Sequence, residues 1–246
     1  MTRIDYTGAA SAYRAARTLP PEVMAAWDAA VAAAALPPPG RVLDLGAGPG
    51  GFLDALGRWS GAPVVAVEPS AAMRAEAAAA GVRGRHPYVA GWAEALPLRP
   101  ASVGWAWLST VVHQLDSRER AAVELHRVLR PGSGRVLLRG YLSDVPLTGV
   151  RFPGAERAAA TFPSTGDVVG SFEAAGFTPA GVHDVVEPWR LDREVWAERI
   201  RSVRHRDSLL RHLTDDEFEE GVARVAAVPG PVVNDMTLRL VVLAVA

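Results

Sequence analysis

The residues best suited to chemistry lie in a glycine-rich segment that follows a short apolar run. Gly46, Gly48 and Gly51 have the spacing of a dinucleotide-binding loop, and Glu68 lies 20 positions after Gly48. Glycines let the backbone approach a ligand closely, and a carboxylate after the next strand can accept hydrogen bonds from ribose hydroxyls. The spacing indicates a site for a ligand that contains adenosine. The alternative is a tight strand-to-helix turn that binds nothing.

Asp44 narrows the choice of ligand. It stands two residues before the first glycine, at the mouth of the preceding strand. A carboxylate at this point would repel a pyrophosphate, whereas it would attract a sulfonium or an ammonium group. Asp44 therefore favours a sulfonium cofactor over a nicotinamide dinucleotide.

Five segments resemble, in order, the motifs of the class I S-adenosylmethionine-dependent methyltransferases. They span roughly residues 40–141 and are Val42–Gly50, Val67–Met73, Gly91–Leu98, Ser102–Asp116 and Glu124–Gly132. The resemblance implies methyl transfer from S-adenosylmethionine to an O or N atom of a small molecule such as a natural product, with S-adenosylhomocysteine as the second product. Two alternatives stay open: an NAD(P)-dependent oxidoreductase that uses the same loop, and a methyltransferase fold that binds the cofactor without transferring methyl.

The resemblance also implies which residues hold the cofactor. Gly46, Ala47 and Gly48 would pack against its methionine part, and Glu68 would hold the ribose hydroxyls. Pro69 and Met73 follow in the same motif, with Met73 against the adenine. The further residues expected around the cofactor are Asp44, Ala93 (through its N–H), Leu108 and Ser109.

Two positions depart from the family pattern. The family often has an Asp where Trp92 stands, and an indole cannot accept the hydrogen bond of the adenine amino group. Trp92 could stack on the ring or shield it, which leaves Glu94 or a backbone carbonyl as the acceptor. The family also usually has an Asp at Gly104, a loss that we expect to affect structure more than chemistry.

Methyl transfer needs an aligned nucleophile and at most one base. His113 is the leading candidate for that base, because the family often carries a substrate-facing His after its fourth strand; the alternative is a His that packs against the following helix. Tyr13 and Tyr141 are expected to bind the substrate. Arg17 is expected to pair with the cofactor carboxylate, with Arg14 as an equivalent choice and a solvated helix face as the alternative.

The elements that must position these residues follow from the apolar periodicity. Apolar runs alternate with helical patterns, which predicts βαβ units and a parallel sheet with helices on both faces. Together with the resemblance, this gives a Rossmann-like, doubly wound α/β fold with a seven-stranded sheet, mostly parallel with an antiparallel last strand, and a helical lid. The expected strands are 41–45, 64–67, 103–108, 135–141, 179–186 and 238–245. The expected helices are 9–36 with a break at Pro20–Pro21, 52–59, 71–80, 117–129, 165–175, 192–210 and 215–227.

The expected organisation has two parts. Residues 1–39 form an N-terminal helical segment that covers the cofactor, and residues 40–246 form the methyltransferase domain. Lid insertions are expected at about 145–165 and 190–228. The second insertion holds a cluster of arginines. We expect them to lie on a solvated helix face and to pair with Asp215, Asp216 and Glu217; the alternative is that they bind an anionic substrate.

Composition excludes several mechanisms. The chain has 246 residues, a formal net charge of -1 and no cysteine, and all 26 basic residues are arginine. Without Cys or Lys there is no thiolate zinc site, thiol nucleophile or Schiff base. The balanced charge disfavours nucleic acid. We therefore expect a cytoplasmic monomer or homodimer that acts on a small molecule, with no metal, nucleic-acid or membrane partner.

Overall fold

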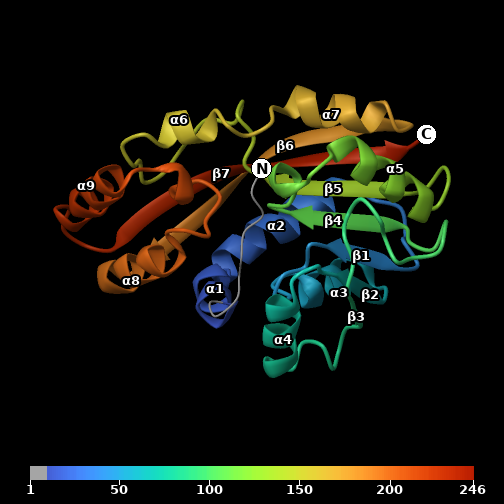
Figure 1. Cartoon of the computed structure of the whole chain (residues 1–246), viewed down its shortest axis with the longest axis horizontal. Helices are drawn as coiled ribbons and strands as arrows, with labels where there is room; N and C mark the ends of the chain where they lie inside the picture. The colour runs from blue at the N-terminus through green and yellow to red at the C-terminus, as the bar shows by residue number, and fades with distance from the viewer. Residues whose placement is uncertain (1–9) are drawn as a thin grey trace.

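A seven-stranded sheet forms the centre of the molecule (Figure 1). The computed structural model describes residues 10–246, except for the side chains of residues 12, 13, 16 and 17. The spatial order of the strands is β3-β2-β1-β4-β5-β7-β6. The strands are β1 (Val42–Leu45), β2 (Val64–Val67), β3 (Tyr88–Val89), β4 (Trp105–Ser109), β5 (Arg135–Gly140), β6 (Phe177–Leu191) and β7 (Val232–Val245).

The pairing pattern confirms the expected fold class. Strands β1 to β5 pair in parallel, while β7 runs antiparallel to both β5 and β6. Strands β1 and β2 are buried along their whole length, as expected for parallel strands covered on both faces. Their carboxyl ends meet at one edge of the sheet, where doubly wound folds bind ligands.

Helices cover both faces of this sheet. They are α1 (Ala10–Arg17), α2 (Pro21–Ala33), α3 (Leu53–Ser60), α4 (Ala71–Ala79), α5 (Arg118–Val128), α6 (Ala155–Ala159), α7 (Thr165–Glu173), α8 (Arg193–Val203) and α9 (Asp215–Ala226), with 3-10 turns η1 (Val112–Gln114) and η2 (Leu210–His212). Helix α2 begins at Pro21, so the break at Pro20–Pro21 is where the sequence predicts it. No helix in the described part of the chain is long and apolar enough to cross a membrane.

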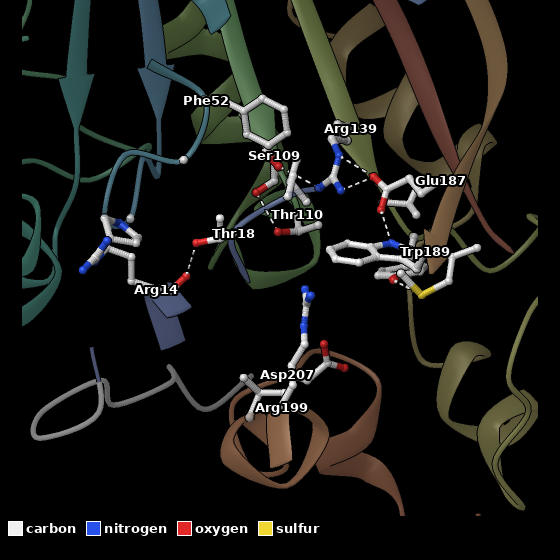
Figure 2. A pocket seen from close by; sticks show the side chains of 18 of the residues that line it. Arg14, Thr18, Phe52, Ser109, Thr110, Arg139, Glu187, Trp189, Arg199 and Asp207 are labelled. Atoms are coloured by element: carbon white, nitrogen blue, oxygen red, sulfur yellow. Dashed lines mark hydrogen bonds and ion pairs between the residues drawn. The ribbon is translucent and has the colours of Figure 1, made fainter. Parts of the chain in front are cut away.

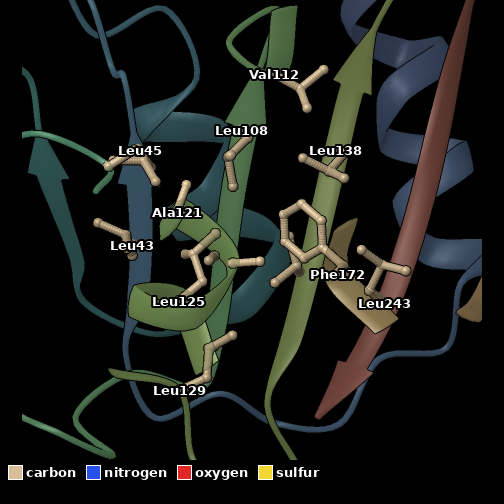
Figure 3. Close-up of a cluster of buried hydrophobic side chains, with 14 of the residues drawn as sticks. Leu43, Leu45, Leu108, Val112, Ala121, Leu125, Leu129, Leu138, Phe172 and Leu243 are labelled. Carbon is tan, nitrogen blue, oxygen red and sulfur yellow. The ribbon is translucent and has the colours of Figure 1, made fainter. Parts of the chain in front are cut away.

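The main core lies between the sheet and helices α5 and α7. Leu125 and Leu129 at the end of α5 and Phe172 of α7 pack on Leu108 of β4 and Leu138 of β5 (Figure 3). A second core on the opposite face is built around Trp27 of α2, Trp107 of β4 and residues of α3. The N-terminal helix α2 is thus part of the core of the sheet.

The two insertions pack against each other as one unit, which we name the lid (residues 145–165 and 190–228). Phe152 from the first insertion stacks on Trp196 of α8 and on Phe218 of α9, with ring centroids 6.2 and 5.6 Å apart. These rings and neighbouring apolar side chains form a third cluster of buried residues. Helix α9 begins with a capping box between Thr214 and Glu217, as the sequence predicts.

Strands β6 and β7 are longer than expected. The sequence predicts strands over 179–186 and 238–245, whereas β6 ends at Leu191 and β7 begins at Val232, paired residue to residue. The additional part of this hairpin carries the lid (Figure 1). The helix expected over 192–210 ends at Val203, because Asp207 accepts hydrogen bonds from the backbone N–H groups of Leu209 and Leu210 and starts a new turn.

Candidate cofactor and substrate site

A cavity of about 370 Å³ lies at the carboxyl ends of β1, β4 and β5. One end is formed by the glycine turn after β1, and the other by residues of α8 and the following loop. Figure 2 shows Arg14 on one side, Ser109, Thr110 and Arg139 at the sheet edge, and Arg199 pointing up from α8. The cavity therefore joins the turn that follows β1 to the lid.

The glycine turn has a backbone that other residues could not adopt easily. Gly46 and Gly48 have φ values of +69° and +55°. A Cβ at Gly46 would lie 2.6 Å from Val111, whereas a Cβ at Gly48 would enter open space. Gly48 thus leaves room beside its backbone for a ligand that approaches closely.

Asp44 is a buried carboxyl in the wall of the cavity, with 3% of its surface exposed. Burial, and then the nearby charge of Glu68, raises the pKa of Asp44 to about 8. A cation placed beside Asp44 would favour its charged form. This end of the cavity therefore suits a positively charged group such as a sulfonium or an ammonium.

Glu68 follows β2 and accepts hydrogen bonds from the backbone of two turns. One carboxylate oxygen accepts from Gly48 N–H at 2.8 Å, and the other accepts from Ser70 N–H at 2.8 Å. Burial raises the pKa of Glu68, and these two hydrogen bonds oppose the shift. Each oxygen keeps a further lone pair, so the carboxylate can also accept hydrogen bonds from ribose hydroxyls.

The structure brings one group of the predicted site residues to the cavity. Asp44, Gly46, Ala47, Gly48, Ser109 and Tyr141 line it, together with Arg14. Arg14 also pairs with Glu76 at 2.6 Å, which joins α1 to α4. The side chains of Tyr13 and Arg17 lie outside the described part of the chain.

A second group of predicted residues lies apart from the cavity lining. Met73 and Ala93 are buried, Trp92 is 44% exposed, and Pro69 is half-buried. Leu108 is in the main core. Glu94 accepts from the backbone N–H groups of Asp116 and Ser117 at 3.0 and 3.3 Å, which holds the chain just before α5.

His113 lies on η1, buried and outside the residues that line the cavity. Its Nε2 is 2.6 Å from Ser208 Oγ, and its ring is 5.1 Å from the ring of Phe162. Phe162 and Ser208 belong to the two lid insertions. His113 thus connects the loop after β4 to both parts of the lid.

A buried charged network forms the sheet side of the cavity, and the sequence analysis missed it. Arg139 at the end of β5 pairs with Glu187 of β6, and both side chains are at least 94% buried. Glu187 also accepts from Trp27 Nε1 at 2.7 Å and from Trp189 Nε1 at 3.1 Å. Arg139 donates to Ser109 Oγ at 2.9 Å (Figure 2). An arginine inside an apolar run was the one signal in the sequence.

Thr110 gives the cavity a strained edge. Its φ is +54°, a conformation that β-branched residues rarely adopt. Its N–H donates to the carbonyl of Arg139 at 2.6 Å, and its Oγ1 donates to the carbonyl of Ser109. The turn ends β4 and leaves Ser109 and Thr110 facing the cavity. Such strain is concentrated at functional sites.

The arginine cluster of the lid divides into different roles. Arg201 pairs with Glu219 on the surface, while Arg204 is buried and donates to the carbonyls of Leu210 and Leu213. Arg199 instead lies in the cavity wall, 4.0 Å from the centre of the Trp189 ring. Arg201 is thus solvated as expected, but its partner is not one of the three predicted acids. Arg204 does pair with the predicted Asp215, at 3.3 Å, but from a buried position, and Arg199 faces the cavity.

Gly104 explains one departure from the family pattern. A Cβ at this position would lie 2.5 Å from Pro39 Cα and within the backbone of that residue. An Asp cannot occupy the position without moving the segment before β1.

No group of three or more His, Cys, Asp or Glu side chains suited to a metal is found among the described residues.

Comparisons with known proteins agree with this geometry. Residues 43–137 match the family model described as a methyltransferase domain. The malonyl-[acyl-carrier protein] O-methyltransferase of Enterobacter lignolyticus (strain SCF1) is 41% identical over 92 residues, which are 37% of this chain and 36% of that protein. The match thus spans little more than a third of the length of this curated relative.

Two solved structures have the same fold over most of the chain. One is a protein assigned as a methyltransferase of an antibiotic biosynthesis pathway in Anabaena variabilis ATCC 29413, with a TM-score of 0.65, 20% identity and coverage of 94% of this chain and 99% of that one. The other is the [4+2]-cyclase SpnF, with a TM-score of 0.59, 20% identity and coverage of 88% and 80%. The resemblance of the motifs and the expected fold class are both confirmed.

Proposed function

We propose that the chain transfers a methyl group from S-adenosylmethionine to an O or N atom of a small molecule, because residues 43–137 match the family model of a methyltransferase domain and the motifs resemble those of the class I S-adenosylmethionine-dependent methyltransferases. The observation that carries the proposal is the cavity that joins the glycine turn and Asp44 to the lid. A cofactor at one end and an acceptor at the other would meet near Ser109. S-adenosylhomocysteine is then the second product.

The end of the cavity proposed to hold the cofactor is built around the turn after β1. Asp44 attracts the positive groups of the cofactor, the backbone at Gly46, Ala47 and Gly48 approaches its methionine part, and Glu68 holds the ribose. When bound, S-adenosylmethionine supplies an electrophilic methyl group. The residues assigned to the adenine side and to the cofactor carboxylate are Pro69, Met73, Trp92, Ala93, Glu94, Arg17 and Arg14.

The acceptor half lies between the sheet edge and the lid. Ser109 borders the reactive methyl, whereas Leu108, expected beside it from the sequence, packs in the main core. Tyr141 and Tyr13 contact the acceptor. Helix α1, within the segment 1–39, covers the cofactor. That His113 removes a proton from the acceptor remains a prediction; its contacts with Phe162 and Ser208 support a role in holding the lid against the β4 loop.

Balanced charge and a cavity of about 370 Å³ beside the lid support a small-molecule acceptor, such as a natural product, rather than a nucleic acid. We place the reaction in the cytoplasm, in a monomer or homodimer.

Equilibrium binding tests the proposal first. Titration of the protein with S-adenosylmethionine and, separately, with NADH and NADPH is expected to show binding of the sulfonium cofactor alone. Binding of a nicotinamide cofactor with none of S-adenosylmethionine would establish the oxidoreductase alternative instead.

Mass spectrometry of reaction mixtures tests the transfer itself. A product heavier than the acceptor by one methylene unit, formed together with S-adenosylhomocysteine, is the expected result. An acceptor that rearranges at constant mass while the cofactor is not consumed would favour a non-methylating activity on this fold, which the [4+2]-cyclase SpnF shares.

A further inference from the structure

Ser109 lines the cavity and carries a hydroxyl hydrogen that it can donate. Its Oγ accepts from Arg139 at 2.9 Å, so its own hydrogen must be donated elsewhere. No acceptor for that hydrogen is found among the described residues. Because the Ser109 oxygen accepts a hydrogen bond from a charged guanidinium, its own O–H group becomes a stronger hydrogen-bond donor. Such a donor best suits an oxygen anion as its partner.

The acids that line the acceptor half are already engaged. Glu187 accepts from two tryptophans and from Arg139, and Asp207 accepts from two backbone N–H groups of the lid. Tyr141 donates to the sulfur of Met236 at 3.4 Å. No histidine is among the described residues that line the cavity. A neutral hydroxyl or an ammonium would therefore meet no ready base, whereas an acceptor that is already an anion needs none.

Arg199 supplies a positive charge from the opposite side. Its guanidinium lies 4.0 Å from the centre of the Trp189 ring, and Trp189 Nε1 donates to Glu187, the partner of Arg139. Figure 2 shows Arg199 on the lid facing the Arg139 side of the cavity. The planar donors of arginine match a carboxylate well.

The rest of the acceptor half is apolar. Its lining includes Leu191, Trp196, Ile200, Leu210 and Met236. An acceptor that fits here has a hydrocarbon or aromatic body and one polar group at the sheet edge.

We propose that the acceptor is an apolar carboxylic acid, bound as its carboxylate by Ser109 and Arg199 and methylated on oxygen, a reaction that does not need the proton removal predicted for His113. This inference rests on the proposed function and deepens it. A carboxylate oxygen attacks the methyl carbon, an O–C bond forms, and the C–S bond breaks with its electron pair passing to sulfur. The products are a methyl ester and S-adenosylhomocysteine, and no proton is transferred.

Matched probes of one chain length test the acceptor class. The protein is first saturated with S-adenosylhomocysteine; if that ligand does not bind, the proposed function itself fails. Octanoate, octanol and octylamine are then titrated by calorimetry at pH 7. We expect octanoate to bind at least tenfold more tightly than either other probe. Equal affinities, preference for octanol or octylamine, or no measurable octanoate binding at millimolar concentration would each overturn the inference.

Two arginines of α8 provide a matched pair of variants. Arg199→Met is expected to weaken octanoate binding about tenfold and to leave octanol binding unchanged. Arg201→Met is the control, because Arg201 pairs with Glu219 on the surface and does not line the cavity. Ser109→Ala is expected to weaken octanoate binding severalfold. An Arg199→Met protein with wild-type affinity for octanoate would remove Arg199 from the site.

Discussion

At the scale of single residues, two buried acids of neighbouring strands belong to the cofactor end of the cavity. Asp44 lies in β1 and lines the cavity, whereas Glu68, just after β2, lies outside the lining and accepts a hydrogen bond from Gly48 N–H. Asp44 and Glu68 are each less than 10% exposed, and the charge of Glu68 adds to the energetic cost of ionising Asp44. Such a pair is unfavourable in the free protein and becomes favourable beside a cation. The predictions for these acids differ, because burial and the Glu68 charge alone shift Asp44, whereas two backbone hydrogen bonds oppose the shift of Glu68.

The raised pKa of Asp44, about 8, makes stability depend on pH. The folded protein keeps a proton that the unfolded chain releases above its ordinary value of 3.8, so stability falls as the pH rises from about 4 to about 8. Between pH 6 and pH 8 we expect the free energy of unfolding of the wild type to fall by about 2 kcal/mol through Asp44, and we expect this fall to be absent in Asp44→Asn. Urea unfolding at the two pH values measures it. The exposed variant Asp216→Asn should retain the wild-type pH dependence; if Asp44→Asn retains it too, Asp44 is not the group responsible.

Glu68→Ala tests the ribose contact directly. The variant loses an anionic acceptor for the ribose hydroxyls and the anchor of the Gly48 N–H, so we expect affinity for S-adenosylmethionine to fall by about 1–3 kcal/mol. Isothermal titration with S-adenosylmethionine gives the value, and Glu173→Ala on the surface of α7 serves as the control. Unchanged affinity in Glu68→Ala would mean that the ribose lies elsewhere.

At the scale of elements, the position of β4 depends on a close approach between Gly104 and the segment before β1. A Cβ on Gly104 would lie 2.5 Å from Pro39 Cα, so Gly104→Ala forces the backbone apart. We expect it to lower the free energy of unfolding by about 1–3 kcal/mol. Gly170 of α7 has open space around its Cβ position, and Gly170→Ala should raise stability by about 0.5–1 kcal/mol. Chemical denaturation that ranks the two variants in the opposite order would contradict this packing.

The sequence predicts an element well when the residues that stabilise it are close together along the chain. Strands β1, β2, β4 and β5 are continuous apolar runs, and caps such as Thr214 are local patterns, so both are predictable. The outer part of the β6–β7 hairpin is not, because it combines Pro188 with surface ion pairs such as Arg190 with Asp235. Such a stretch has the composition of a loop.

The candidate site divides in the same way. The glycine turn and Asp44 are adjacent in sequence, so their spacing is enough to predict them. The Arg139–Glu187 pair joins β5 to β6 across 48 positions, and its tryptophan Trp27 comes from α2. Sheet order and strand length together create this network, and neither can be derived from residue spacing alone.

At the scale of the whole molecule, the chain contains a sheet core and a separate lid cluster. The β6–β7 hairpin joins them, and α1 also contacts α8 of the lid. The two clusters share no buried residue, and the cavity lies where they meet. A unit with its own small core can open while the rest stays folded, and binding sites are often placed beside such units. The contact of His113 with Ser208 and Phe162 is one of the links that would break on opening.

Two phenylalanine variants separate lid opening from global unfolding. Phe152→Ala removes the ring that stacks on both Trp196 and Phe218, so amide hydrogen exchange in α8 and α9 should become faster by a factor of about ten or more, while exchange in β1 and β4 stays as in the wild type. Phe172→Ala in the main core should instead lower the melting temperature of the whole protein and speed exchange in every strand. If Phe152→Ala accelerates exchange in β1 and β4 as strongly as in α8, the lid and the sheet unfold as one unit. In that case acceptor entry would require a route other than opening of the lid.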